Sequence, residues 1–527
     1  MLSSRLPAAR SQALLGFSLL LLALWAAWQI GGTIASGDLR SIEFATLGFA
    51  ACVVAVAVLR NWRTGFYLFL VWMLFEDLTR KYLGNGTALF FGKDVLILLV
   101  YISFFVAVRS GREKAFRPAF LIPLLLFTWL GVAQVFNPNS PSLLYGLLGF
   151  KLYFYYIPLM FVGYALIRND EDLQKFLAAN ISLAGLIAFL GIIQAIVGHS
   201  FLNPTVLAPE LRDLGELDKV TPLSGQLFSL PSSVFVSSGR FALYLIFSLI
   251  LTIGTAGYLL LHARRYRTLT FVVIAIVGAA TLLSGSRGAV MYGLTTTLVM
   301  TVGLLWGAPW RWGQAHRLVK AIRRYCIVGV LGLAVLLMIF PDEAASRIEF
   351  YVETLLPSGS SYEMGNRTWD YPMRNLEAAF DRPNWTVGNG IGTASLGTQY
   401  VSKLLHKPAP DLVVEEGFGT MIIEMGIVAP FLWLLWTGTF LYYAWKIVRQ
   451  LRETRLFPIG FAIFWYGAML LLLQTYTGIN AYQNFVNNAY FWLLVGVLFR
   501  LPDVLATTPA VSIVSSSRKT PRGGFQF

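Results

Sequence analysis

The stretch TLTFVVIAIVGAATLLSGSRGAVMYGLTTTLVMTVGLLWG, residues 268–307, decides the fold of this chain. It covers nearly all of two apolar runs, 268–284 and 289–308, each long enough to cross a membrane. A short tip containing Arg287 joins the two runs. Basic clusters lie beyond both outer ends of the pair, at 264–267 and 311–324. Since Lys and Arg concentrate on the cytoplasmic side, the tip is predicted to face the opposite compartment. A cation there with no acid nearby in sequence indicates an anionic ligand.

The composition places the whole chain among membrane proteins. Of 527 residues, 56% are hydrophobic and only 13% are charged, and apolar runs of about 20 residues recur throughout. A net charge of +14 would suggest nucleic acid as the partner of a soluble protein, but a membrane protein carries such an excess in its cytoplasmic loops. We therefore expect no nucleic-acid partner, and membrane lipids as the surroundings.

The apolar runs predict an all-α polytopic membrane protein with about 14 transmembrane helices, in a range of about 12–14. The candidate spans are about 13–34, 42–59, 64–79, 92–108, 118–136, 145–167, 173–197, 238–261, 268–284, 289–308, 325–341, 418–445, 457–477 and 486–499. They divide the chain into N-terminal helices (1–117), core helices with a loop at 198–237 (118–341), a large loop (342–417), C-terminal helices (418–500) and a tail (501–527) that is predicted to be disordered.

The charge distribution predicts the orientation of these spans. With both termini in the cytoplasm, the cytoplasmic side holds 26 of the 41 Lys and Arg residues and 6 of the 27 Asp and Glu residues. That side then carries +20 and the outer side −6, and this Lys and Arg bias is what sets membrane topology. Both long loops fall on the outer side. In the larger one, Asp342–Leu356 and Thr368–Phe380 are predicted to be helical.

Five cations near the outer face are candidate phosphate ligands, because a guanidinium can hold phosphate oxygens in pairs. Arg287 and Arg240 each begin a predicted span, and Lys151 lies in the outer third of another, in the aromatic run KLYFYY. Arg367 and Arg374 lie on one face of the second loop helix, about 10 Å apart by helical rise. The alternative is that such cations reach lipid headgroups or pair with loop acids, which is the preferred interpretation for Arg374.

Two residues are candidate general bases on the outer side. Glu415 directly precedes the span at 418–445, where a carboxylate can accept a proton, although the helix dipole also favours acids at this position. His406 is the weaker candidate, since its Lys- and Pro-rich surroundings predict a solvated loop. Glu424, two turns into the same span, is expected to have a partner because a charge in the bilayer is costly.

Neither a nucleotide site nor a metal site is predicted. The sequence contains no Walker A motif and no His and Cys cluster with metal-ligand spacing. The run Gly388-Asn-Gly-Ile-Gly392 follows no βαβ unit, so it predicts a tight turn rather than a nucleotide-binding loop. We therefore expect no metal and no cofactor.

Four short motifs carry a resemblance to a known family. In chain order they are LLSGSRGA at 282–289, Arg367 followed by Trp369, the turn at 388–392, and EEGFGTMIIEMG at 415–426. Through them, residues 120–500 resemble the O-antigen ligase/polymerase superfamily of bacterial inner-membrane glycosyltransferases. The resemblance implies a location in the bacterial inner membrane, with both termini in the cytoplasm and the large loops in the periplasm.

The resemblance also implies the chemistry. The donor would be an undecaprenyl-diphosphate-linked saccharide whose diphosphate meets Arg287 and Arg367, with Arg240 in support, and the acceptor would be a glycan or a lipid. Glu415 would accept the acceptor's proton, and arginines would replace a metal in stabilising the leaving group. Ligases of the family have His at the position of Glu415, so this departure favours a polymerase over an O-antigen ligase acting on the lipid A core.

Two other classes of function stay open. One is a non-enzymatic transporter of lipid-linked glycans, and the other is a scaffold for polysaccharide assembly proteins. A transporter predicts charged residues along a central path and two related halves, and the sequence shows neither clearly.

Overall fold

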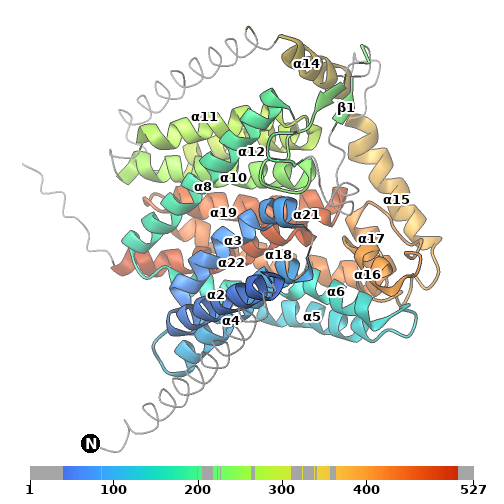
Figure 1. Ribbon diagram of the computed structural model, residues 1–527. Coiled ribbons are helices and arrows are strands. Elements are labelled where there is room, and N and C mark those ends of the chain that lie inside the picture. Colours follow the sequence, from blue (N-terminus) through green and yellow to red (C-terminus); the bar gives the residue numbers. More distant parts are fainter. Residues whose placement is uncertain are drawn as a thin grey trace, which may run out of the picture.

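The computed structural model describes residues 39–84, 86–198, 200–204, 218–221, 224–225, 227–262, 267–309, 323, 338, 341–356 and 364–507. Most of this part of the chain is helical, and the helices pack against one another in a bundle (Figure 1). The first predicted span at 13–34, nearly all of the eleventh at 325–341 and most of the tail at 501–527 lie outside the described residues.

The other twelve predicted spans fall on described helices. These helices are α2 (Leu39–Arg60), α3 (Trp62–Leu83), α4 (Thr87–Arg109), α5 (Leu121–Val135), α6 (Leu143–Phe154), α7 (Leu159–Leu166), α8 (Asp170–Val197), α10 (Ser238–His262), α11 (Arg267–Leu283), α12 (Arg287–Gly307), α17 (Gly417–Met425), α18 (Val428–Gln450), α19 (Phe457–Ala468) with its π-helical extension η2 (Met469–Gln474) and α20 (Thr475–Thr477), and α22 (Phe485–Thr507).

By length and composition, seven helical stretches in the described part of the chain can cross a membrane. They are Leu89–Arg109, Leu143–Leu166, Asp170–Val197, Ser238–Leu261, Arg287–Gly307, Phe457–Thr477 and Phe485–Ala506. The chain is therefore a helical membrane protein, while a total of about 14 spans stays a prediction.

The remaining elements lie in the two long loops, except α21, which lies between the last two predicted spans. The predicted helix at 342–356 is confirmed as α14 (Pro341–Leu355), and the one at 368–380 is confirmed as a π-helical turn, η1 (Asn366–Asp370), that continues into α15 (Tyr371–Phe380). Further elements were not predicted: α16 (Thr398–Leu405), α21 (Asn480–Gln483), and the antiparallel strands β1 (Asp218–Val220) and β2 (Leu227–Ser229).

The prediction of one continuous span at 418–445 is wrong. The short helix α17 ends at Met425, and Gly426 then has a φ of +82°, which a residue with a Cβ rarely adopts. A Cβ at Gly426 would also lie 2.5 Å from the carbonyl oxygen of Thr386, in the large loop. The loop therefore packs directly against this break, and Glu424 precedes α18 instead of lying within it.

Glycines allow a close helix contact between α7 and α22. A Cβ at Gly163 would lie 2.1 Å from the carbonyl oxygen of Leu493, and one at Gly496 would lie 2.0 Å from that of Met160. Small residues at a helix interface let the backbones approach in this way, which is how helices commonly pack within membranes. The backbones of α7 and α22 are therefore packed directly against each other.

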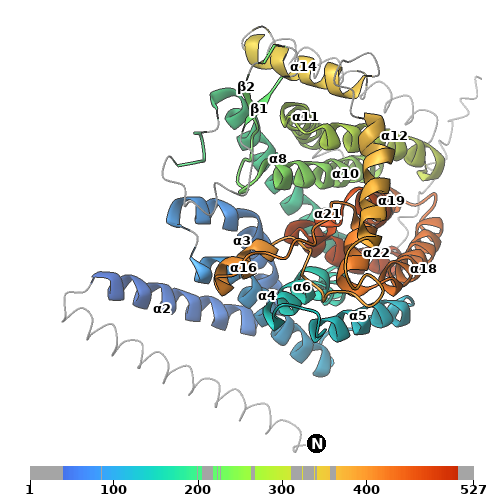
Figure 2. The same ribbon diagram turned by 90° about the vertical axis from the view of Figure 1, so that its right-hand side faces the viewer.

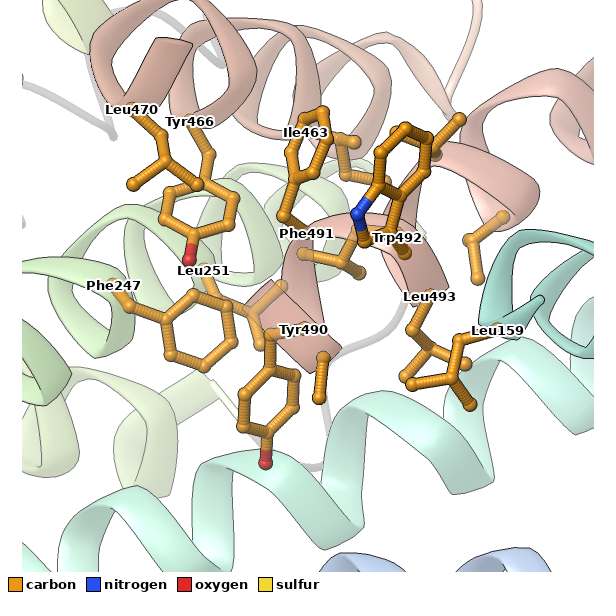
Figure 3. Close-up of a cluster of buried hydrophobic side chains, with 14 of the residues drawn as sticks. Leu159, Phe247, Leu251, Ile463, Tyr466, Leu470, Tyr490, Phe491, Trp492 and Leu493 are labelled. Atoms are coloured by element: carbon orange, nitrogen blue, oxygen red, sulfur yellow. The ribbon is translucent and has the colours of Figure 1, made fainter. Parts of the chain in front are cut away.

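Aromatic side chains fill the space between α10, α19 and α22 (Figure 3). The rings of Phe247 and Tyr490 stack with their centroids 4.2 Å apart, and the ring of Tyr466 lies 5.2 Å from that of Phe247. Leu251 and Ile463 complete this layer from α10 and α19. The core here is apolar and closely packed.

The two ends of the bundle differ. At one end, ion pairs join segments that the charge count assigns to the cytoplasm: Arg168 with Glu113 at 2.6 Å and Arg455 with Asp170 at 3.7 Å. At the other end lie β1, α14, α15, α16 and α17, on the right-hand side of Figure 1 and facing the viewer in Figure 2. All candidate site residues belong to this second end, which we call the loop face.

Candidate functional site

The glycine turn at 388–392 anchors the large loop to the helices beneath it. Gly388, Gly390 and Gly392 have φ values of +87°, +95° and +89°, so the predicted tight turn is confirmed. The side-chain amides of Asn137 and Asn139 both donate hydrogen bonds to the carbonyl oxygen of Gly388, at 3.0 and 3.1 Å. The turn is thus held by the connection between α5 and α6, and it fixes where the following loop residues lie.

Replacing Gly392 by Ala is expected to destabilise the protein. An added Cβ would lie 2.1 Å from the carbonyl oxygen of Tyr145 and would require the same positive φ. Gly84→Ala is the matched control, because Gly84 has a φ of +90° but no atom within 4 Å of an added Cβ. We expect Gly392→Ala to lower the free energy of unfolding by about 1–3 kcal/mol more than Gly84→Ala, as measured by denaturation of the purified protein in detergent. Equal losses would contradict the close packing.

Glu424 is the buried centre of a second anchor. Its carboxylate accepts hydrogen bonds from the Ser395 hydroxyl (2.5 Å), the backbone N–H of Ala394 (3.0 Å) and the Tyr153 hydroxyl (3.1 Å). The side-chain amide of Gln483 donates to the Ser395 hydroxyl at 2.7 Å, which ties α21 into the same network. The expectation that Glu424 has partners is therefore confirmed. Because the carboxylate is fully buried, we assign it to structure rather than to contact with a substrate.

The two anchors hold Glu415 next to Arg367. The carboxylate oxygen of Glu415 lies 3.6 Å from a guanidinium nitrogen of Arg367, and both side chains are about half exposed. The backbone N–H of Glu415 donates to the side-chain oxygen of Asn375 on α15, at 3.1 Å. The Arg367 guanidinium also lies 5.0 Å from the ring centre of Tyr371. A predicted base and a predicted phosphate ligand, far apart in sequence, thus share one solvent-accessible position.

The segment at 475–479 lies directly beside this pair. A Cβ at Gly417 would lie 2.1 Å from the carbonyl oxygen of Thr475, and one at Gly478 would lie 2.9 Å from that of Glu415. The hydroxyl of Tyr292, on α12, lies 3.2 Å from that of Thr477. Since Tyr292 is about 7.5 Å along the helix from Arg287, the beginning of α12 and Glu415 approach the same short segment from two sides.

Arg287 is the first residue of α12, as predicted. The Ser286 hydroxyl caps the helix by accepting from the backbone N–H of Ala289, at 3.2 Å. The Arg287 side chain is half-buried, and its guanidinium lies 5.2 Å from the ring centre of Phe350 on α14. That ring packs in turn on Phe228 of β2. Arg287 therefore lies where α12 meets the covering elements of the loop face.

Arg240 and Lys151 are paired with acids that the sequence analysis did not connect with them. Arg240 forms two hydrogen bonds to the carboxylate of Asp77, at 3.0 and 2.8 Å, and Lys151 lies 2.5 Å from a carboxylate oxygen of Asp94. Both cations are partly exposed, whereas Asp77 is buried. Arg240 and Lys151 are therefore each paired with a protein carboxylate, and a ligand bound by either cation would lie next to that carboxylate.

These two pairs belong to a larger group of charged side chains beneath the loop face. Glu76 lies 2.8 Å from Lys93, Arg80 bonds Asp77 at 3.1 Å, and Lys81 donates to the Ser232 hydroxyl and the Ser233 carbonyl oxygen. We call the group the charge cluster, and it consists of Glu76, Asp77, Arg80, Lys81, Lys93, Asp94, Lys151 and Arg240. Charges of both signs inside the apolar stretches 64–79 and 92–108 were the signal that could have revealed it.

Aromatic rings line the charge cluster. The ring centre of Phe90 lies 5.0 Å from the Arg80 guanidinium, 4.7 Å from the Lys93 ammonium and 4.9 Å from the Lys151 ammonium. The ring of Phe485, at the start of α22, lies 4.7 Å from Lys93 and 5.2 Å from Arg240. Since α22 follows the segment at 475–484, the charge cluster and the Glu415 position flank opposite ends of that segment.

The two remaining candidates lie apart from these groups. Arg374 bonds the side-chain oxygen of Asn366 at 2.6 Å and the carbonyl oxygen of Asp370 at 3.2 Å, so it stabilises its own helix. His406 is exposed and ends α16 in a left-handed conformation, with a φ of +53°. Among the residues that the structure describes, no hydrogen bond or ion pair joins either side chain to Glu415.

Glu416, next to the candidate base Glu415, has a structural role at the start of α17. Its carboxylate caps α17 by accepting from the backbone N–H groups of Phe418 and Gly419. Burial raises the pKa of Glu416 from 4.5 to about 7, and these two hydrogen bonds act in the opposite direction. Glu416 therefore fixes the start of α17, and Glu415 extends from it toward solvent.

The pKa of Glu416 predicts how stability depends on pH. Because its folded-state pKa lies above its ordinary value, the unfolded chain loses this proton first as the pH rises. We therefore expect the free energy of unfolding to fall between about pH 5 and pH 7, and Glu416→Gln to remove that part of the decline. Thermal unfolding of both proteins from pH 5 to pH 8 checks this. Parallel pH profiles would contradict it.

No group of three or more His, Cys, Asp or Glu side chains that could hold a metal ion occurs among the residues that the structure describes. Neither a protein-family model nor any curated protein matches the chain. The geometry of the loop face and the four short motifs therefore carry the indications of function.

Proposed function

We propose that this protein is a glycosyltransferase that transfers or polymerises saccharide units from an undecaprenyl-diphosphate-linked donor at the loop face. A polymerase is favoured, and an O-antigen ligase acting on a lipid A core or another acceptor is the alternative. The proposal is supported chiefly by the contact between Arg367 and Glu415. Transfer from a diphosphate needs a cation for the leaving group and a base for the acceptor, and these two side chains offer both at one accessible position.

The reaction would proceed in one displacement. The acceptor's hydroxyl oxygen attacks the anomeric carbon of the donor sugar, and the bond from that carbon to the diphosphate oxygen breaks. The electron pair of that bond leaves with the diphosphate, whose growing charge Arg287 and Arg367 stabilise. The hydroxyl proton passes to the carboxylate of Glu415 and from there to water. The products are an extended glycan and undecaprenyl diphosphate.

We place the protein in a bacterial inner membrane with the loop face in the periplasm. The charge count supports this orientation, and the segments around Glu113, Asp170 and Asp503, which it assigns to the cytoplasm, carry ion pairs at the end of the bundle away from the loop face. The polyprenyl chain of the donor would lie in the lipid beside the spans, and its diphosphate would reach the loop face at the membrane boundary.

Purified protein incubated with an undecaprenyl-diphosphate-linked oligosaccharide, with and without a second acceptor, tests the proposal. A ladder of products from the donor alone indicates a polymerase, and a single transfer that requires the second acceptor indicates a ligase. The absence of any transfer product from folded protein would overturn the proposal and would favour a transporter or a scaffold.

A further inference from the structure

One face of the loop helix formed by η1 and α15 lies against Glu415 and the start of α17. Arg367, Tyr371 and Asn375 follow one another at intervals of four residues, so their side chains lie along the same side of this helix. Figure 1 shows α15 beside α17, and a Cβ at Gly419 would lie 3.3 Å from the carbonyl oxygen of Asn375. The face that carries these three side chains is therefore the one that meets α17.

All three side chains contact Glu415. Arg367 forms the ion pair with its carboxylate at 3.6 Å, and the side-chain oxygen of Asn375 accepts from its backbone N–H at 3.1 Å. The hydroxyl of Tyr371 donates a hydrogen bond to the Glu415 carboxylate. The Tyr371 residue is itself held from both sides: its carbonyl oxygen accepts from the Asn375 amide at 2.9 Å, and its ring centre lies 5.0 Å from the Arg367 guanidinium.

The protonation of Tyr371 agrees with a role as a hydrogen-bond donor. Burial raises the pKa of the Tyr371 phenol above its ordinary value, and the hydrogen bond to Glu415 and the charge of that carboxylate raise it further. Asn375 and Arg367 act in the opposite direction without reversing the shift. The phenol therefore keeps its proton near neutral pH and can donate it to the carboxylate throughout that range.

The ion pair with Arg367 is a weak constraint on the carboxylate. A half-exposed ion pair contributes only about 0–1 kcal/mol, whereas a hydrogen bond from a hydroxyl to a carboxylate is short and directional. A base that acts on a substrate hydroxyl is commonly oriented by a further side chain. Since a carboxylate can accept about four hydrogen bonds, one from Tyr371 leaves room for the hydroxyl of an acceptor.

We propose that the Tyr371 hydroxyl orients the Glu415 carboxylate toward the acceptor hydroxyl, which makes Tyr371 a positioning residue of the transfer site. The inference rests on the proposed function, because it requires Glu415 to be the base. Tyr371 exchanges no proton with the substrate in this role. Because the phenol holds the carboxylate, Arg367 is free to turn toward the diphosphate of the donor while the base stays in place.

A titration of Tyr371 tests the contact without measuring turnover. The purified full-length protein carries fluorotyrosine in place of Tyr371, and the ionisation of this group is followed by fluorine NMR in detergent. We expect Glu415→Gln to move the titration to lower pH, because the neutral amide no longer disfavours the phenolate. Glu377→Gln is the matched control, since it removes an exposed carboxylate from the same helix and should leave the titration in place.

The pH dependence of transfer tests the positioning role. We expect Tyr371→Phe to lower kcat about 10-fold, the effect of losing one hydrogen bond to a charged group, with little change in KM for the lipid-linked donor. The acidic limb of its pH profile should move to higher pH, because the lost donor favoured the charged form of the base. Tyr351→Phe is the control, since it removes a hydroxyl bond to the Leu282 carbonyl oxygen from another loop helix and should leave the pH profile in place.

The two measurements separate this inference from the proposed function. A shifted titration, together with slower transfer and a displaced acidic limb in a folded Tyr371→Phe protein, supports the positioning role. A titration that Glu415→Gln leaves in place would overturn it, and so would a wild-type rate and pH profile in Tyr371→Phe. If the wild-type protein transfers no saccharide but Glu415→Gln still shifts the titration, the proposed function fails while the orientation of Glu415 by Tyr371 stands.

Discussion

Replacing Glu415 by Gln is expected to lower the rate of glycosyl transfer by about 10²- to 10⁴-fold, the usual contribution of a positioned general base. The amide keeps the size of the carboxylate and can still accept from Arg367, but it cannot take a proton. Because Glu415 is about half exposed, stability should change little. The measurement is the initial rate of product formation from a lipid-linked oligosaccharide, with thermal unfolding as the check on folding.

The loop supplies a matched control for this substitution. Arg382 and Asp411 form another exposed ion pair, at 3.8 Å, and Asp411 is 98% exposed. If the Arg367–Glu415 pair were only a surface salt bridge, Glu415→Gln and Asp411→Asn would have the same small effect. A selective loss of transfer in Glu415→Gln supports the proposed base. Wild-type rates in both variants would refute it.

The candidate base Glu415 and the cation Arg367 could be predicted from sequence, because each is identified by its immediate neighbours in the chain. Glu415 directly precedes an apolar helix, and Arg367 opens a loop helix, so each is visible within a few residues. The turn at 388–392 was likewise predictable, since three glycines in five residues permit positive φ. The contact between Arg367 and Glu415 could not be predicted from sequence. It depends on how the turn and Glu424 hold the loop against α5 and α6.

The charge cluster could not be assembled from sequence because its pairs join distant helices. Arg240 bonds Asp77 across 163 positions, and Lys151 bonds Asp94 across 57. An acid in an apolar helix predicts that a partner exists, because an unpaired charge there is costly, but it does not identify that partner. The sequence therefore predicts a ligand for Arg240 and Lys151, whereas the structure pairs each of them with a protein carboxylate. The break at Gly426 was missed for a similar reason, since it accommodates the distant residue Thr386.

Arg287→Ala is expected to have the largest effect on how the protein stabilises the charge of the diphosphate leaving group. Removing one preorganised donor to a developing anion typically lowers the rate by about 10²- to 10³-fold. Arg287→Lys should retain part of the activity, because an ammonium keeps the charge but lacks the paired donors of a guanidinium. The measurement is kcat and KM for the lipid-linked donor, together with the length and yield of the product.

The Arg287 substitutions need a control for structure, because this guanidinium also lies over Phe350. Lys219 provides it, since its ammonium lies 5.3 Å from the centre of the same ring but belongs to strand β1. A cation over an aromatic ring contributes about 0.5–1 kcal/mol at an accessible site, and the Lys219 side chain is partly exposed, so Lys219→Ala should lower stability slightly and leave transfer unchanged. A folded Arg287→Ala protein with wild-type product length and yield would exclude Arg287 from the site. In that case the leaving group would have to bind at Arg367, whose guanidinium lies 3.6 Å from the Glu415 carboxylate.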